Sequence, residues 1–288
     1  MKIGIGLPAS IPGVSHAEVL EWARLADAGP FSSVGIIDRV VYPNWEPLIA
    51  LAAAAAVTQR VRLMTTLLIG PVRDAVLLAK QAASIDALSE GRLTLGLGVG
   101  RREDDYRAVG GNFHRRGSRF EQQLGLMKRV WAGENLVDSS GPIGPAPVQL
   151  GGPEILIGAF ASAAIQRAGK WADGYLGGGG DPHGSRVLYD EVARIWKEHE
   201  RIGSPRFVVT NAFALGSSAA ERGAVQARHY NLFLGVDGAE QAARRVLSEP
   251  EAIRQIIQEF EQVGLDEMVF LPQVADRDQV SRLAEIVG

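Results

Sequence analysis

Eight short apolar segments of β-strand character recur along the chain, and a segment with helical spacing of apolar residues follows each one. The strand segments are Lys2–Pro8, Ser33–Asp38, Val61–Ile69, Leu93–Val99, Glu154–Ala159, Asp173–Gly178, Arg206–Leu215 and Asp266–Pro272. Eight β–α units in 288 residues predict a closed (β/α)8, or TIM, barrel of the α/β class, in one domain spanning residues 1–288. A doubly wound open sheet is the alternative, but it normally has fewer units.

Helix starts and irregular segments refine this pattern. Ser15–Glu18 and Ser218–Glu221 both have the S-x-x-E form of a capping box, which predicts a helix start at each. In the third helix, Leu78 and Leu88 are expected on one packed face. Irregular insertions are expected at the C-terminal face of the barrel. Three segments without motifs are expected to decide the substrate: Arg39–Pro47, Leu136–Pro153 and Phe233–Pro250.

Composition excludes several classes of function. A net charge of −3 gives no bulk attraction to nucleic acid or to acidic membranes, and no apolar run approaches the length of a membrane span. The chain has no cysteine, which excludes disulfides and thiolate chemistry. The histidines have no metal-ligand spacing, so we expect no metal site. We expect a cytoplasmic protein that acts on a small molecule, with neither nucleic acid nor membrane as partner.

The stretch Gly91–Gly111 combines a strand with a dense polar run. Gly96, Gly98 and Gly100 occupy alternate positions, so one face of the strand leaves its backbone accessible to another group. The segment Gly96–Gly100 lacks the G-x-G-x-x-G spacing of a dinucleotide-binding turn. Charged residues follow where parallel α/β folds place their chemistry, at the carboxyl end of the strand.

Two long motifs carry a family resemblance. PVRDAVLLAKQAASIDALSEGRLTLGLGVG (Pro71–Gly100) and ILIGAFASAAIQRAGKWADGYLGG (Ile155–Gly178) resemble the bacterial luciferase-like superfamily of flavin-dependent monooxygenases and coenzyme F420-dependent oxidoreductases. The resemblance covers nearly the whole chain. It implies a (β/α)8 barrel with FMN or coenzyme F420 across the carboxyl end.

The resemblance also implies which residues hold the cofactor. Its ring would rest on a bulge at the end of strand three, often with a non-proline cis peptide, which here falls on Thr66, Leu67 and Leu68. The strand-four turn would form another wall, with Gly98, Val99, Gly100 and Arg101. The cofactor phosphate would lie at the turn after strand five, on Gly158, Ala159, Phe160, Ala161 and Ser162. Free N–H groups at a helix start favour a phosphate there. The alternative role for the glycines of strand four is to make room inside a tapered barrel.

The catalytic residues stay open because the chain departs from the family pattern. Many relatives end strand two with Asp-His, whereas this chain has Asp38-Arg39. Relatives that use the deazaflavin often have Glu after the strand-four glycine, where this chain has Arg101, and the luciferase-type cysteine is missing. Candidate catalytic residues are Asp38, Arg39 and Glu103. Asp38 has a structural alternative, a hydrogen bond to its own loop.

Further expectations concern substrate and assembly. Arg101 and Arg102 either bind an anionic group or pair with the acidic residues 103–105. Trp45, Arg102 and His183 are candidate substrate contacts. Gly177–Gly180 is either a mobile lid or a tight loop. Alanine-rich faces on the second and third helices, through which relatives dimerise, predict a homodimer.

Two chemistries fit the resemblance. With FMN, the reduced ring would react with oxygen, and with coenzyme F420 only hydride transfer would occur. The Arg101–Arg102 pair and the missing cysteine favour hydride transfer. The alternatives are a non-catalytic flavin-binding barrel and a flavin-independent, phosphate-binding isomerase.

Overall fold

A closed parallel barrel forms the centre of the molecule. The computed structural model describes residues 1–137 and 141–288. Within these residues, nine strands form one all-parallel sheet in the order β3-β2-β1-β9-β8-β7-β6-β5-β4, and β3 also pairs with β5, which closes the ring. The strands are β1 (Lys2–Gly6), β2 (Ser33–Ile36), β3 (Arg62–Thr65), β4 (Leu68–Ile69), β5 (Leu93–Gly98), β6 (Glu154–Gly158), β7 (Gly174–Gly178), β8 (Arg206–Phe213) and β9 (Glu267–Pro272).

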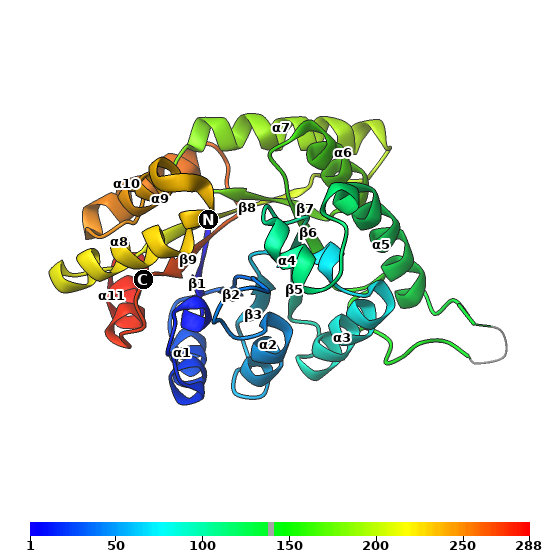
Figure 1. Cartoon of the computed structure of the whole chain (residues 1–288), viewed down its shortest axis with the longest axis horizontal. Coiled ribbons are helices and arrows are strands. Elements are labelled where there is room, and N and C mark those ends of the chain that lie inside the picture. The colour runs from blue at the N-terminus through cyan, green and yellow to red at the C-terminus, as the bar shows by residue number, and fades with distance from the viewer. Residues whose placement is uncertain (138–140) are drawn as a thin grey trace.

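The third predicted strand is interrupted, because β3 and β4 are its two halves on either side of Thr66 and Leu67. When β3 and β4 are counted as one interrupted strand, the described sheet has eight barrel strands, which confirms the predicted (β/α)8 barrel. Helices surround it in Figure 1. The surrounding helices are α1 (His16–Ala28), α2 (Pro47–Ala55), α3 (Ala75–Leu88), α5 (Arg116–Trp131), α6 (Ser162–Trp171), α7 (Pro182–Glu198), α10 (Pro250–Gln262) and α11 (Asp278–Val287).

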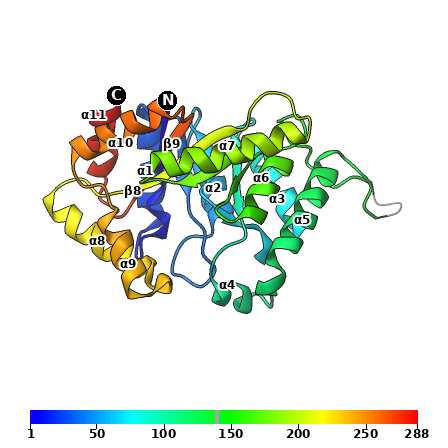
Figure 2. The ribbon, with the colours of Figure 1, turned by 90° about the horizontal axis from the view of Figure 1, so that it is seen from above.

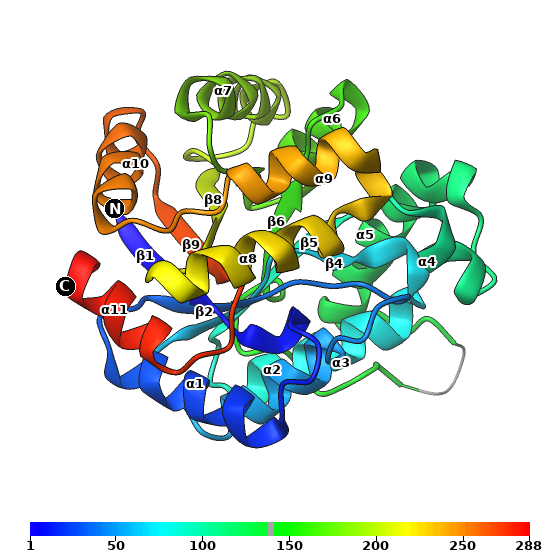
Figure 3. The ribbon, with the colours of Figure 1, turned by 60° about the vertical axis from the view of Figure 1, so that its left-hand side comes forward.

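Three further helices extend the carboxyl end of the barrel. They are α4 (Glu103–Ala108), α8 (Ser217–Tyr230) and α9 (Gly235–Arg244), and the 3-10 turn η4 (Leu232–Leu234) links α8 to α9. Figure 2 shows all three helices along one edge of the molecule, opposite both termini. Figure 3 shows α8 and α9 lying side by side across the strands, and many of their residues are in contact. This edge is the C-terminal face, where a (β/α)8 barrel carries its chemistry.

The barrel interior is layered because alternate residues of each strand point inward. Its middle layer is apolar and fully packed, and consists of Met64, Leu156, Leu176, Val208 and Val269. The layer at the amino end of the strands, called the floor below, is charged. In it Glu154 pairs with Arg206 at 2.6 Å and accepts a hydrogen bond from Thr94 at 2.7 Å, and Arg206 also pairs with the buried Glu267. The floor charges compensate one another, as buried charges must.

Several local predictions were wrong. The box at Ser218 does not form, because Gly216 precedes the first residue of α8 and no side chain caps this helix, whereas the box at Ser15 is present. Leu88 is 71% exposed because α3 ends there. The segment Phe233–Pro250, expected to be irregular as well as without motifs, contains a helix at residues 235–244.

The segment Leu136–Pro153 is largely irregular, and its residues 138–140 lie outside the described residues. It connects α5 to β6 and therefore lies at the amino end of the strands. Asp86 on α3 anchors it by accepting the backbone N–H groups of Val148 and Gln149 at 2.8 and 3.0 Å. This position takes it away from the C-terminal face. Among the described helices, none combines the length and the apolar character needed to cross a bilayer.

Candidate active site

A cavity of about 640 Å³ opens at the C-terminal face, between the ends of β2, β4, β5 and β6. Most of the residues that the sequence suggested line it. They are Asp38, Arg39, Thr66, Leu67, Gly98, Val99, Gly100, Arg101, Arg102, Gly158, Phe160 and Ala161. We call this space the first chamber. Its volume is that of a typical cofactor or ligand site.

The interrupted third strand and the glycines of β5 fit each other. A Cβ at position 96 would lie 1.9 Å from the Thr65 carbonyl oxygen, and one at position 98 would lie 2.8 Å from the Leu67 side chain. Gly158, on β6, also faces Leu67, with 2.3 Å to a hypothetical Cβ. The Thr66–Leu67 peptide is cis, as the resemblance implied. The glycines thus make room for the bulge, and Leu67 forms the base of the first chamber.

Asp38 pairs with Arg73. Arg73 directly follows the 3-10 turn η2 (Gly70–Val72), which comes after β4. The Asp38 carboxylate accepts bonds from the Arg73 guanidinium at 2.7 and 3.3 Å and from the Ile69 N–H at 2.8 Å. Burial raises the pKa of Asp38, and Arg73 and the Ile69 N–H oppose this rise. The partner of Asp38 is Arg73 and not its own loop, so this carboxylate belongs to a buried ion pair at the edge of the chamber.

Arg39 lies in an aromatic box. Its guanidinium carbon is 4.6 Å from the Tyr42 ring centroid, 5.0 Å from that of Tyr230 and 5.9 Å from that of Phe233. It also donates to the carbonyl oxygens of Tyr230 and Val41. These contacts tie the loop after β2 to the end of α8. The guanidinium contributes a positive charge to the lining of the chamber.

The polar run after β5 forms the short helix α4. Arg102 pairs with Asp104 and lies over Phe233, 5.1 Å from its centroid, while it also faces the chamber. Arg101 lines the chamber and makes no ion pair with any described residue. Glu103 is exposed and lies outside the lining. Of the two alternatives for the arginine pair, pairing with the acidic residues is found for Arg102, and Arg101 makes no such pair among the described residues.

Asp105 is a residue whose role the sequence did not reveal. It is 1% exposed, and its Oδ1 accepts the backbone N–H groups of Val40 and Val41 at 2.9 and 2.7 Å. The bonds fix the loop after β2 against α4. The signal available in the sequence was only its membership of an acidic run.

The start of α6 supplies the wall opposite α4. Ala161 is its N-cap and no side chain caps it, so the first N–H groups of the helix are open. Phe160 lines the chamber and is 65% exposed. Of the remaining predicted positions, Ala159 and Leu68 are buried beneath the lining, and Ser162 begins α6 outside it.

Two predicted substrate residues lie away from the chamber. His183 is exposed in the first turn of α7. Trp45 is 38% exposed and donates its indole N–H to the Val14 carbonyl at 3.1 Å. Neither residue lines the first chamber in the described part of the chain.

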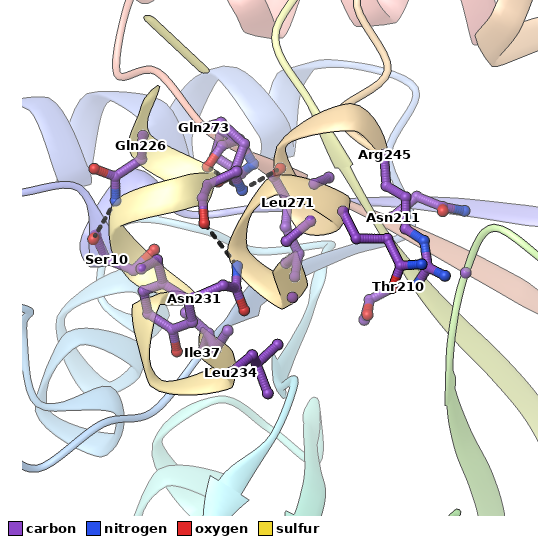
Figure 4. Close-up of a pocket in the computed structure, with 18 of the residues that line it drawn as sticks. Ser10, Ile37, Thr210, Asn211, Gln226, Asn231, Leu234, Arg245, Leu271 and Gln273 are labelled. Carbon is purple, nitrogen blue, oxygen red and sulfur yellow. Dashed lines mark hydrogen bonds between the residues drawn. The ribbon is translucent and has the colours of Figure 1, made fainter. Parts of the chain in front are cut away.

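A second chamber of about 310 Å³ adjoins the first, between the ends of β8 and β9 and the helices α8 and α9. Figure 4 shows side chains of Gln226 and Asn231 on one side of it and those of Thr210, Asn211 and Arg245 on the other. The two chambers share Ile37 and Tyr230 in their linings.

Tyr230 is the most informative residue that the sequence did not reveal. Burial raises the pKa of its phenol, which therefore stays protonated at neutral pH, and the hydroxyl has no hydrogen-bond partner among residues 1–137 and 141–288. A protonated hydroxyl on a residue that lines both chambers can donate to an oxygen of a bound molecule. The aromatic cluster His229, Tyr230 and Phe233 was its only signal in the sequence.

Comparison with known proteins agrees with this arrangement. An uncharacterized protein of Mycobacterium tuberculosis is 32% identical over 206 residues, which cover 61% of this chain and 70% of that protein. An FMNH(2)-dependent dimethylsulfone monooxygenase of Pseudomonas fluorescens is 27% identical (54% of this chain, 46% of that protein). A putative coenzyme F420-dependent oxidoreductase of Mycobacterium tuberculosis is 33% identical (49% of this chain, 40% of that protein).

Solved structures share the fold across the whole chain. The monooxygenase RslO1 from Streptomyces bottropensis superposes with a TM-score of 0.79 at 23% identity, covering 99% of this chain and 97% of that one. An F420-dependent secondary alcohol dehydrogenase in complex with an F420-acetone adduct has a TM-score of 0.78 at 13% identity, with the same coverage. The family model described as luciferase-like monooxygenase matches residues 1–270. The chain therefore belongs to the luciferase-like monooxygenase family, whose members are oxidoreductases and monooxygenases.

Proposed function

We propose that the protein is a coenzyme F420-dependent oxidoreductase that transfers a hydride between the deazaflavin and a small organic substrate. The observation that carries the choice of cofactor is the positive charge of the first chamber. Four arginines line it, Arg39, Arg101, Arg102 and Arg116, against the two aspartates Asp38 and Asp105, and of the four only Arg102 makes ion pairs among the described residues, with Asp104 and Asp105. Both aspartates already have partners in the protein.

The residues of the first chamber fit such a cofactor. Thr66 Oγ1 and Arg39 Nε are buried and have no hydrogen-bond partner among the described residues, although both residues line the chamber. Buried polar atoms are normally paired, so heteroatoms of a ring would complete them. The open start of α6 and the arginines would hold the anionic tail.

The charge of the tail favours coenzyme F420 over FMN. FMN ends in one phosphate, whereas coenzyme F420 continues from a phosphate into a chain of glutamates. Arg101 has no ion pair within the described residues and stands at the edge of the chamber, where such a tail would leave it. A longer anionic tail makes use of more of these charges.

The chemistry divides between cofactor and protein. Coenzyme F420, when bound, supplies or accepts the two electrons of a hydride. The protein holds the substrate in the second chamber and excludes water. Tyr230 donates a hydrogen bond to the substrate oxygen. In reduction of a carbonyl, the substrate carbon gains the hydride and the substrate oxygen gains the proton of the Tyr230 hydroxyl, which bulk solvent replaces after product release; oxidation of the alcohol reverses these transfers.

Titration of the purified protein with coenzyme F420, with its tail-less deazaflavin and with FMN tests the proposal. We expect coenzyme F420 to bind most tightly. Its advantage in affinity over the other two ligands should decrease with added salt, because the tail contacts are ionic. Preference for FMN would support the oxygen-dependent alternative. Binding of none of the three would favour a flavin-independent barrel and overturn the proposal.

Arg101→Gln provides the sharper test. It should weaken coenzyme F420 binding roughly tenfold, the effect of losing a charge-assisted contact, and leave the tail-less deazaflavin unaffected. Arg107→Gln is the matched control, because Arg107 is an exposed arginine of α4 outside the chamber lining. Equal effects of the two substitutions would show only a general electrostatic attraction.

We also propose that the protein is a homodimer through α2 and α3. These alanine-rich helices leave Ile49, Leu77 and Leu88 exposed, at 64%, 54% and 71%. Large exposed apolar side chains on neighbouring elements favour an interface. Light scattering after size-exclusion chromatography should give a dimer, and Leu77→Glu should give a monomer.

A further inference from the structure

We infer that the second chamber receives small hydroxylated carboxylic acids, or the matching keto acids, as substrates. The inference rests on the proposed function for the reaction and on the residues of this chamber for the class of molecule. The chamber adjoins the first one, and Ile37 and Tyr230 belong to both linings. A molecule within it can therefore present a carbon to the cofactor side and an oxygen to the Tyr230 hydroxyl.

The charge of the chamber is carried by one residue. Arg245, at the end of α9, is the only charged side chain in the lining formed by the described residues, and no carboxylate faces it there. It makes no ion pair with any described residue, whereas its neighbour Arg244 lies 3.7 Å from Glu240. A free guanidinium beside an otherwise neutral lining is suited to bidentate contact with a carboxylate.

The amides of the chamber point to hydroxyl groups. Gln226 donates its amide nitrogen to the Ser10 carbonyl at 3.3 Å, and Asn231 donates to the Ala227 carbonyl at 2.8 Å. Gln273 donates to the Leu271 and Pro272 carbonyls, each at 3.3 Å. Because a carbonyl accepts only from the nitrogen, these bonds fix which way each amide is turned. The three amide oxygens have no donor among the described residues, so they are acceptors for the hydroxyl groups of a ligand.

The two features occupy different sides of the chamber. In Figure 4, Arg245 lies with Asn211 and Thr210 on one side, and Gln226 and Asn231 lie across from them. A ligand that satisfies both sides carries an anionic group at one end and hydroxyl groups along its length. The apolar residues Leu234 and Leu271 between them match a short carbon chain.

Ligand-observed NMR on the cofactor-free protein tests this assignment. The probes are lactate, 4-hydroxybutyrate and mandelate, each paired with its neutral carboxamide of the same size. We expect at least one acid to bind roughly tenfold more tightly than its amide, because only the acid forms a charge-assisted pair. Arg245→Gln should abolish that preference, and Arg244→Gln, a substitution of the next residue outside the lining, should keep it.

Three outcomes would overturn the inference: no acid binds, acids bind no better than amides, or Arg245→Gln retains the preference. If both arginine variants lost the preference for the acid equally, Arg245 would act only as a positive charge at the end of α9. That outcome would also overturn the inference. Titration of the same proteins with coenzyme F420 separates the two proposals. Acid preference without cofactor binding contradicts the proposed function only, and normal cofactor binding without acid preference contradicts this inference only.

Discussion

Leu67 shows how one side chain constrains the residues around it. It lies over the backbone of both Gly98 and Gly158, where any larger residue would collide with it. It also packs on the apolar middle layer of the barrel. The base of the first chamber is therefore set jointly by one leucine and two glycines on different strands.

Two substitutions in β5 should separate backbone from side-chain crowding. Gly96→Ala places a methyl group 1.9 Å from a backbone oxygen, which cannot move away, and should cost about 3 kcal/mol of stability in urea denaturation. Gly98→Ala meets only the flexible Leu67 side chain, 2.8 Å away, and should cost about 1 kcal/mol. Leu67→Ala added to Gly98→Ala should recover packing at that site. Equal losses for the two single substitutions would contradict this account.

The sequence places Asp38 and Arg39 at the mouth of the barrel because both follow a strand. It does not reveal that Arg73 binds Asp38 or that the aromatic rings of residues 42, 230 and 233 surround Arg39. Those partners lie up to about 190 positions away, and only closure of the barrel brings them together. The local sequence predicts which residue follows the end of a strand, but it does not predict which distant residue that side chain will contact.

At the scale of elements, the same S-x-x-E motif has two outcomes. At α1, Ser15 and Glu18 form the reciprocal box, but at α8 the helix already begins at Ser217, so Ser218 lies inside its first turn. Helical periodicity predicts that a helix exists, whereas its first residue depends on the loop that precedes it. Here Gly216, with φ of 100°, sets that start.

This difference gives a matched pair of substitutions. Ser15→Ala removes a cap and should cost about 1 kcal/mol of unfolding free energy. Ser218→Ala removes a hydroxyl that caps nothing and should stay within about 0.5 kcal/mol of the wild type. Denaturant midpoints of both variants provide the check, and a larger loss at Ser218 would mean that α8 begins later in solution.

Asp27 joins α1 to the start of β3. Its carboxylate accepts the backbone N–H groups of Gln59, Arg60 and Val61 at 2.8 to 2.9 Å. Partial burial acts to raise the pKa of Asp27, but these donors and Arg60 outweigh it and hold the pKa below its ordinary value. A lowered folded pKa means that the stabilisation is present above the unfolded pKa and is lost as the pH falls through the folded one.

The stability of the wild type should therefore decrease below about pH 4 partly through Asp27. Asp27→Asn cannot ionise, so the variant should be less stable at neutral pH and should lose less on acidification. Urea midpoints measured from about pH 7 to pH 3 would show this as a flatter profile. Parallel profiles for the two proteins would assign the acid sensitivity to other carboxylates.

At the scale of the whole molecule, the eight repeated units were enough to predict the barrel. The bulge at the end of the third strand was implied only by the family resemblance. The sequence did not show that α8 and α9 enclose a second chamber, because the one motif in the segment from 217 to 249, at Ser218–Glu221, indicates only a helix start. The fold follows from a repeated pattern of apolar residues. The chambers follow from loops and added helices, whose course depends on contacts distant in sequence.

We expect the charged floor of the barrel to contribute to stability and the first chamber, at the opposite end, to bind the cofactor. One substitution in the floor should separate these two properties. Glu267 is fully buried in the floor, accepts the hydroxyl groups of Ser32 and Ser33 at 2.5 and 2.6 Å, and pairs with Arg206. Glu267→Gln removes one charge of a buried pair and should cost about 3 kcal/mol. Glu261→Gln is the control, since Glu261 is half exposed, lies 3.7 Å from the N-terminus and should cost less than about 1 kcal/mol.

Cofactor affinity should be unchanged in Glu267→Gln, because the apolar middle layer separates the floor from the first chamber. Urea denaturation and titration with coenzyme F420 measure the two properties on the same protein. A loss of affinity without a loss of stability would mean that the floor charges act on the mouth through the barrel interior. A stability equal to that of Glu261→Gln would mean that Arg206 is sufficiently compensated by Glu154, which lies 2.6 Å away.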